Sequence, residues 1–153
     1  MFMSQGPTPE KMLRPSVLYR VSAVLLVLFA LGHQIGFRQV DPSWNADAVA
    51  GAMQSVRFEV QGFDRTYWEF FSGFGFFVTT LLVFSAVLAF ELSRLPAQVL
   101  RAFSRVRWAF ALCYLVIAVL TWGYFFLAPG IFATVAALCL ALAAAVQPRE
   151  EKP

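Results

Sequence analysis

The chain has 153 residues, of which 59% are apolar and 14% charged, and its mean hydropathy is +0.67. Soluble domains average about 45–50% apolar and about 25% charged residues. This composition excludes a disordered chain, a coiled coil and an ordinary cytosolic enzyme, and it predicts an integral membrane protein. Because about 20 residues cross a bilayer, four spans nearly use up the chain and leave no room for a soluble catalytic domain. We therefore expect a single transmembrane domain over residues 1–153.

Four apolar runs predict four transmembrane helices, over about residues 17–37, 68–92, 108–127 and 131–146. The expected fold class is all-α, an integral membrane four-helix bundle. Ala128-Pro129-Gly130 predicts a tight turn that joins the last two helices as an antiparallel hairpin. The fourth run is rich in alanine and leucine, and its small face suits close packing against neighbouring helices.

The basic residues are distributed unevenly between the predicted connections. The first connection, residues 38–67, holds only Arg38, Arg57 and Arg65. The other nine lie in the N-terminal segment, the second connection and the tail: Lys11, Arg14, Arg20, Arg94, Arg101, Arg105, Arg107, Arg149 and Lys152. The positive-inside rule then predicts cytoplasmic termini (N-in/C-in) and an outer loop over residues 38–67. Basic residues spread over short juxtamembrane segments also argue against a nucleic-acid partner.

The predicted outer loop is longer than a connection needs. Asp41-Pro42-Ser43-Trp44-Asn45 is typical of a turn that leads into a helix. Residues 46–58 then place Val49, Met53 and Val56 on one face, which predicts a short amphipathic helix lying on the membrane. Such a helix is either a lid over a site or a plug that closes the bundle.

Polar residues gather where the first predicted helix ends and the second begins. His33, the only histidine, precedes the outer end of the first helix, and Glu69 follows the start of the second. Because the two helices run antiparallel, both side chains are expected at a similar depth. A carboxylate in a span faces protein rather than lipid, so the expected inward stripe is Glu69, Ser72, Gly73, Phe76 and Thr80. A His–Glu pair there would place a proton donor and an acceptor together.

This pattern gives two sets of candidate site residues. The catalytic candidates are Glu69, His33 and Asp64. The ligand-binding candidates surround them in the predicted bundle: Gln34, Arg38, Trp44, Arg65, Tyr67, Trp68, Gly73, Phe76, Thr121, Trp122 and Tyr124. Structural interpretations stay open beside these. His33 and Glu69 would then only bridge two helices, and the Tyr and Trp residues would form an interfacial belt. Asp64 and the neighbouring arginines would pair at the surface, or the arginines would hold an anionic headgroup.

The sequence predicts neither a metal nor a cofactor. A single histidine supplies at most one axial ligand to haem, and a zinc site lacks ligands for the same reason. Cys113 and Cys139 both fall inside predicted spans, without a Cys-x-x-Cys motif, and are expected to be apolar packing residues.

Two segments carry a resemblance. Gly-His-x-x-Gly-Phe at residues 32–37 and Arg-Thr-Tyr-Trp-Glu-Phe-Phe-Ser-Gly-Phe-Gly at residues 65–75 resemble small, uncharacterised bacterial four-helix inner-membrane proteins. That resemblance implies a multi-pass protein of the bacterial inner (plasma) membrane and no particular activity. In size and number of spans the chain is also loosely similar to DoxX-type proteins. Its chemistry is similar to that of membrane sterol isomerases of the emopamil-binding class, from which no residue carries over.

Two functions follow from these observations. In the first, a hydrophobic, isoprenoid- or lipid-like molecule binds between the helices, and Glu69 and His33 perform acid–base isomerisation, cyclisation or epoxide opening. In the second, the chain is a non-catalytic accessory subunit of a larger membrane complex. The expected partners are membrane lipid and a hydrophobic small molecule. Further copies of the chain in a homo-oligomer, or another protein of a membrane complex, are also expected.

Overall fold

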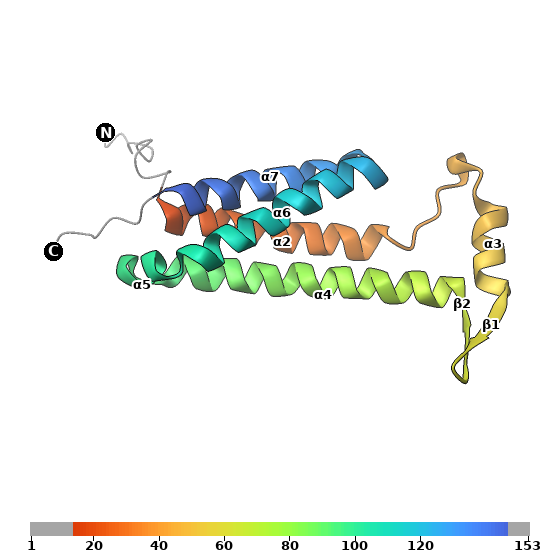
Figure 1. The fold of residues 1–153 in the computed structure, drawn as a ribbon. Helices are drawn as coiled ribbons and strands as arrows, with labels where there is room; N and C mark the ends of the chain where they lie inside the picture. Colours follow the sequence, from red (N-terminus) through yellow and green to blue (C-terminus); the bar gives the residue numbers. More distant parts are fainter. Residues whose placement is uncertain (1–13, 147–153) are drawn as a thin grey trace, which may run out of the picture. The chain divides into compact units, whose positions relative to one another are not determined.

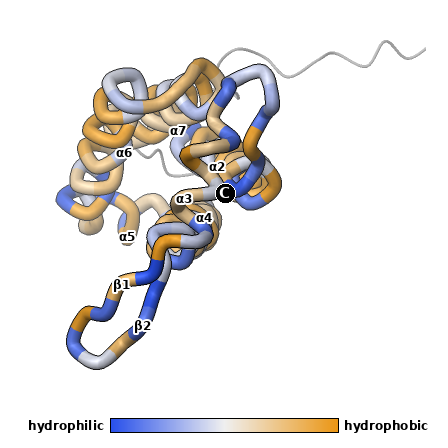
Figure 2. Tube along the Cα trace, turned by 90° about the vertical axis from the view of Figure 1, so that its right-hand side faces the viewer, coloured by the Kyte–Doolittle hydropathy of each residue, from blue (hydrophilic) through white to orange (hydrophobic). Residues whose placement is uncertain are grey.

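The computed structural model describes residues 14–146. Within it, four helices are long and apolar enough to cross a membrane: α2 (Pro15–Gly36), α4 (Tyr67–Arg94), α6 (Ser104–Tyr124) and α7 (Leu127–Ala145) (Figure 1). Figure 2 shows that hydrophobic residues predominate along these helices. These helices confirm the expectation of a mostly helical, multi-pass membrane protein. Lys11, Arg149 and Lys152, which enter the orientation argument, lie outside the described residues.

Short elements occupy the connections. The first connection contains η1 (Pro42–Trp44), α3 (Asp47–Ser55) and the strands β1 (Arg57–Val60) and β2 (Phe63–Thr66), and α5 (Ala97–Ala102) follows α4. At η1, hydrogen bonds from Ser43 lower the pKa of Asp41. The placement of α3 on a membrane surface remains a prediction, and none of its residues is buried.

The two strands form an antiparallel hairpin that was not predicted from the sequence. Arg57 pairs with Thr66 and Val60 with Phe63, so only two residues make the turn. Those residues, Gln61 and Gly62, have positive φ angles of 53° and 83°. A two-residue turn of this kind matches the natural twist of paired strands and favours glycine at its second position. Alternating residues in 57–60, followed by this glycine, were the signal for the hairpin.

The described residues divide into two compact units, named here unit 1 (residues 14–29 and 83–146) and unit 2 (residues 30–82). Unit 1 is built on the pair α6 and α7, which pack along each other. The buried face of α7 is nearly all alanine, and such small side chains let neighbouring helices approach closely. Its buried residues include Ala133, Ala136, Ala137, Leu140, Ala143 and Ala144. The expected small packing face of this segment is therefore present.

The connection between α6 and α7 differs from the prediction. α7 begins at Leu127, so Ala128, Pro129 and Gly130 form its first turn rather than a loop. Phe125 and Phe126, both extended, make the actual connection. Proline is tolerated in the first turn of a helix because the backbone N–H groups there have no partner within the helix. The side chain of Cys113 is exposed rather than packed, whereas that of Cys139 is partly buried.

Candidate functional site

Unit 2 brings the end of α2 and the middle of α4 together through three polar side chains. His33 Nδ1 lies 3.0 Å from the Thr79 hydroxyl, which in turn lies 3.1 Å from Gln34 Oε1. The same hydroxyl is 3.2 Å from the carbonyl oxygen of Gly75, one turn earlier in α4. We call His33, Gln34 and Thr79 the His33 cluster. All three side chains are partly buried, as expected for polar groups that satisfy one another inside a membrane protein.

The hydrogen bonds of the cluster favour one tautomer of the imidazole. The Thr79 hydroxyl has one proton and faces two oxygen acceptors, on Gln34 and Gly75. When that proton goes to either oxygen, the contact with His33 requires an imidazole N–H at Nδ1. In neutral histidine the other ring nitrogen, Nε2, is then an acceptor. The Gln34 amide group retains N–H donors, so the cluster offers both an acceptor and a donor.

Aromatic rings border the cluster. The His33 imidazole stacks on Phe37, with ring centroids 5.0 Å apart and planes 9° apart. Phe37 also contacts Phe71 and, edge to face, Phe76. The Phe37 ring lies against Gly75, where a Cβ atom would overlap it. Glycine at this position thus allows the ring to reach α4 and hold the imidazole.

These contacts correct the predicted inward stripe of α4. Thr79, rather than Thr80, faces His33, and the Thr80 hydroxyl instead bonds to the carbonyl oxygen of Phe76 in its own helix. The close approach occurs at Gly75 rather than at Gly73, where an added Cβ atom would meet nothing within 4 Å. One residue corresponds to about 100° of rotation on a helix, so a difference of one residue, from Thr80 to Thr79, changes which side of α4 faces His33.

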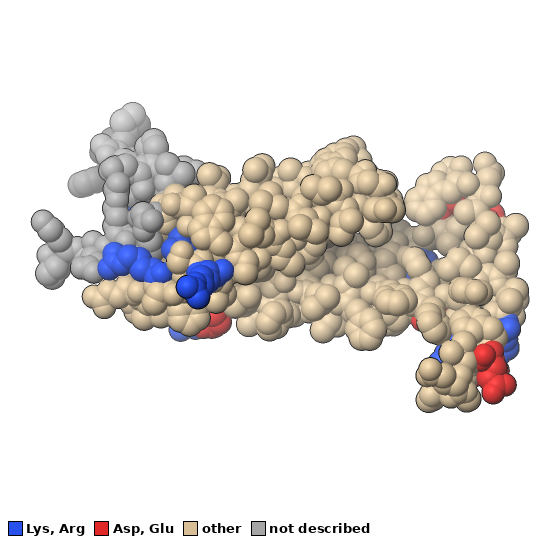
Figure 3. Space-filling view, in the orientation of Figure 1, with Lys and Arg blue, Asp and Glu red and all other residues tan. Residues whose placement is uncertain are grey.

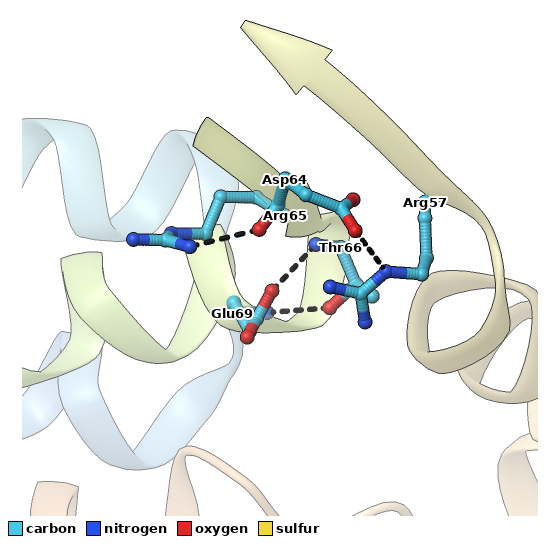
Figure 4. Close-up of polar contacts among 5 residues, drawn as sticks. All are labelled: Arg57, Asp64, Arg65, Thr66 and Glu69. Carbon is cyan, nitrogen blue, oxygen red and sulfur yellow. Dashed lines mark hydrogen bonds and ion pairs between the residues drawn. The ribbon is translucent and has the colours of Figure 1, made fainter. Parts of the chain in front are cut away.

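In the described residues Glu69 has no hydrogen bond to His33. It caps the start of α4 instead. Its carboxylate accepts a hydrogen bond of 2.7 Å from the Thr66 backbone N–H (Figure 4). The Thr66 hydroxyl accepts one of 3.2 Å from the Glu69 backbone N–H. This reciprocal pair is a capping box, which satisfies two N–H groups that a helix start leaves without partners. The sequence Thr66-x-x-Glu69 ahead of an apolar run was the signal for it.

The capping role predicts a modest effect of Glu69→Gln. Glutamine keeps an oxygen that accepts from the Thr66 N–H, so we expect the free energy of unfolding to fall by under about 1 kcal/mol. Ligand retention should not change. Thermal unfolding of the detergent-solubilised variant, measured beside Glu69→Ala, checks this, because alanine removes the acceptor and should cost about 1 kcal/mol. If Glu69→Gln remained folded but lost a bound molecule completely, that result would instead support the acid–base role.

The other charged candidates of unit 2 lie around the hairpin. The Asp64 carboxylate pairs with Arg57 at 2.8 Å across the strands, rather than with Arg65 or Arg38 (Figure 4). Its hydrogen bond and charge raise the pKa of Arg57. The pair is exposed, so solvent screening keeps its contribution to stability small. Arg65 donates to the backbone carbonyl of Asp64, and Arg38 lies over the rings of Phe37 and Phe76.

The aromatic candidates are divided between the two units. In unit 2, Trp44 belongs to η1, Tyr67 packs on Phe58, and Trp68 packs on Phe71. In unit 1, the Trp122 indole donates a 2.9 Å hydrogen bond to the Thr134 hydroxyl and packs beside Gly130. Trp122 thus contacts α7. The buried Thr121 bonds to the carbonyl oxygen of Ile117 in its own helix, and Tyr124 is exposed.

Arg107 in unit 1 is the polar residue whose place the sequence did not indicate. From the sequence, Arg107 was assigned to a connection. In the structure it lies near the start of α6 and is only 3% exposed. Its Nη2 donates to the carbonyl oxygens of Ala143, Ala144 and Val146, the last two at 3.0 and 2.9 Å. Nε contacts the hydroxyl of Tyr19 from α2 at 3.3 Å. Arg107 therefore caps the C-terminal end of α7, where carbonyl groups lack partners and a positive charge is favourable.

Unit 1 also carries an apolar groove. Its volume is about 400 Å³, and side chains of α2 and α4 line it: Ala23, Val24, Val27, Leu28, Val83, Ala86, Val87 and Phe90. No polar side chain lines the groove, so its surface suits an alkyl chain. Among residues 14–146, no three His, Cys, Asp or Glu side chains come together as a metal site would require.

No family model, curated protein or solved structure matches this chain. The likeness of residues 32–37 and 65–75 to small bacterial inner-membrane proteins therefore remains a prediction from the residues themselves.

Proposed function

We propose that this membrane protein binds a hydrophobic small molecule whose hydroxyl or carbonyl head reaches the His33 cluster. The observation that carries the proposal is the fixed imidazole: Thr79 bonds to Nδ1 and Phe37 stacks on the ring, so Nε2 remains as an acceptor in the same cluster as the Gln34 amide. A hydroxyl head can donate to Nε2 and accept from that amide, and a carbonyl head can accept from it. The surrounding phenylalanines favour a flat or isoprenoid-like body.

Binding is favoured over acid–base catalysis by the position of Glu69. Its carboxylate is held by the Thr66 N–H at the start of α4, while His33 bonds to Thr79 further along the same helix. Isomerisation, cyclisation or epoxide opening would require both groups to contact one reacting molecule. We therefore place catalysis by His33 and Glu69, and any role of Asp64 in it, second to binding.

The accessory-subunit function has one specific observation in its favour. α4 exposes a row of large apolar side chains at alternating spacings of four and three residues, namely Phe70, Phe74, Phe77, Leu81 and Phe84. This spacing is the one with which a helix packs along another helix. In a bilayer the same row would also contact lipid, so a partner helix remains the alternative.

We further propose the bacterial inner membrane as the location, with cytoplasmic termini. The support is the contrast between residues 38–66, with three arginines, and the shorter segment from the end of α4 into the first turn of α6, with Arg94, Arg101, Arg105 and the buried Arg107. Residues 38–66 form the longer of these two segments and hold fewer arginines, so their density of basic residues is the lower one.

The binding proposal is tested by extracting the organic-soluble content of the gently solubilised protein and of His33→Ala. We expect an apolar molecule at about one per chain in the wild type. Its amount should fall at least about tenfold in the variant, because one or two partly buried hydrogen bonds are lost. A thermal unfolding curve confirms that the variant is folded. Equal retention by both proteins, or a stoichiometric protein partner without such a molecule, would contradict the proposal and favour the accessory subunit.

A further inference from the structure

The β1–β2 hairpin of unit 2 has two chemically different faces. The strand register places Arg57, Glu59, Asp64 and Thr66 on one face and Phe58, Val60, Phe63 and Arg65 on the other, because alternate residues of a strand point to opposite sides. The first face is polar and contains the Arg57–Asp64 ion pair. The second face is apolar except for Arg65. We call it the Arg65 face.

The Arg65 face is turned toward the start of α4. Phe58 packs on Tyr67 and Phe70, with ring centroids 4.8 and 5.4 Å apart. β2 ends at Thr66 and α4 begins at Tyr67, so no linker separates the hairpin from the span. In Figure 1 the hairpin runs across the direction of the first turns of α4, as a segment lying along a membrane surface would.

A hollow of about 220 Å³ lies on this face, lined by Val60, Gln61, Phe63, Arg65 and Phe70. Phe63 is 61% exposed and Val60 48%, so the apolar walls are open to the surroundings. The Arg65 guanidinium lies over the Phe63 ring at 5.4 Å and uses Nη1 to bond to the Asp64 carbonyl oxygen. In the described part of the chain, its Nε and Nη2 make no other hydrogen bond, so they can serve a ligand.

The charges of the hairpin are arranged asymmetrically. Both of its acidic residues, Glu59 and Asp64, belong to the polar face, whereas the Arg65 face carries a single positive charge. Figure 3 shows acidic side chains on the side of the hairpin turned away from α4. An anionic group that approaches the Arg65 face therefore meets the guanidinium and no acidic residue of the hairpin, and the one carboxylate at the start of α4, that of Glu69, is bonded to the Thr66 N–H. Guanidinium groups bind phosphate through paired N–H donors.

We propose that the hollow binds the phosphate of an anionic phospholipid, with Arg65 on the phosphate and Val60, Phe63 and Phe70 on the adjoining acyl region. A lipid is favoured over free phosphate because three of the five lining residues are apolar and continue onto a membrane span. This inference requires only the membrane location and is independent of the His33 cluster.

The test compares binding of dioleoyl-phosphatidylglycerol and dioleoyl-phosphatidylcholine to the delipidated full chain by native mass spectrometry. We expect the wild type to prefer phosphatidylglycerol and Arg65→Gln to lower that preference about fivefold, the effect of one basic residue at an anionic surface. Arg57→Gln is the matched control, since it removes the same charge from the other face and should change the preference by less than about twofold. Arg65→Lys should retain most of it.

Three outcomes would overturn the inference. The first is an unchanged preference in Arg65→Gln. The second is an equal fall in Arg65→Gln and Arg57→Gln, which would show a general charge effect rather than a site. The third is displacement of phosphatidylglycerol by millimolar inorganic phosphate, which would show that the apolar walls contribute nothing. Because His33→Ala should leave this preference intact, failure here and failure of the binding proposal are distinguishable.

Discussion

Replacing Arg107 with leucine should lower the free energy of unfolding by about 3 kcal/mol, which corresponds to a fall of roughly 10 °C in Tm for a chain of this size. Leucine leaves the carbonyl oxygens of Ala143, Ala144 and Val146 without their donor, and each orphaned buried acceptor costs about 1–3 kcal/mol. Removal of the buried charge offsets part of this cost. Thermal unfolding in a fixed detergent, followed by intrinsic fluorescence, measures the change.

The neighbouring Arg105 supplies the matched control. It lies two residues earlier in α6, carries the same charge and is exposed. Arg105→Leu should change the free energy of unfolding by no more than about 0.5 kcal/mol, as surface substitutions usually do. The free energy of unfolding of Arg107→Lys should lie between those of Arg107→Leu and Arg105→Leu, because an ammonium group cannot reproduce the planar array of guanidinium donors. Equal melting of Arg107→Leu and Arg105→Leu would contradict the capping of α7 by Arg107.

Thr79→Val should weaken binding at the His33 cluster by about tenfold or more. Valine preserves the shape of threonine but removes the hydroxyl that holds His33 Nδ1 and faces Gln34 Oε1. The imidazole then loses its fixed orientation, and a partly buried donor is left without its acceptor, at about 1–3 kcal/mol. The measurement is the occupancy of the co-purified molecule, determined by native mass spectrometry over a dilution series.

Thr80→Val makes the same chemical change one residue away. The Thr80 hydroxyl bonds only to the Phe76 carbonyl oxygen of its own helix, and its side chain is exposed. This variant should therefore retain the molecule as the wild type does. A loss of occupancy in Thr80→Val as large as in Thr79→Val would show that a general change in α4, rather than the His33 cluster, governs binding.

The spans could be predicted because hydropathy decides them. The predicted helices 17–37 and 68–92 differ from α2 and α4 by at most two residues at each end. The starts of α6 and α7 were placed four residues late. At α6 the arginines were assigned to a connection, although Arg107 is satisfied by carbonyl groups of α7. At α7 proline was taken as a turn signal, although a first helical turn accepts it.

The candidate site was predicted only in part, because hydrogen-bond partners depend on rotation about the helix axis. His33 and Gln34 do share one hydrogen-bonded group, but their partner on α4 is Thr79 rather than Glu69. The role of Glu69 was visible as a local capping motif and required no tertiary information. Arg107 carried no comparable signal, since its acceptors at the end of α7 lie 36, 37 and 39 residues further along the chain.

The most direct test of the central claim uses the single histidine of the chain. Protein grown with ¹⁵N-labelled histidine has only one imidazole to observe, and nitrogen chemical shifts distinguish protonated from bare ring nitrogens. At mildly alkaline pH, where histidine is neutral, we predict a proton on Nδ1 and a bare Nε2 in the delipidated protein. Restoring the co-purified molecule should shift Nε2 and leave Nδ1 bonded to Thr79. A proton on Nε2 in the delipidated protein, or an Nε2 signal indifferent to the molecule, would contradict the proposed site.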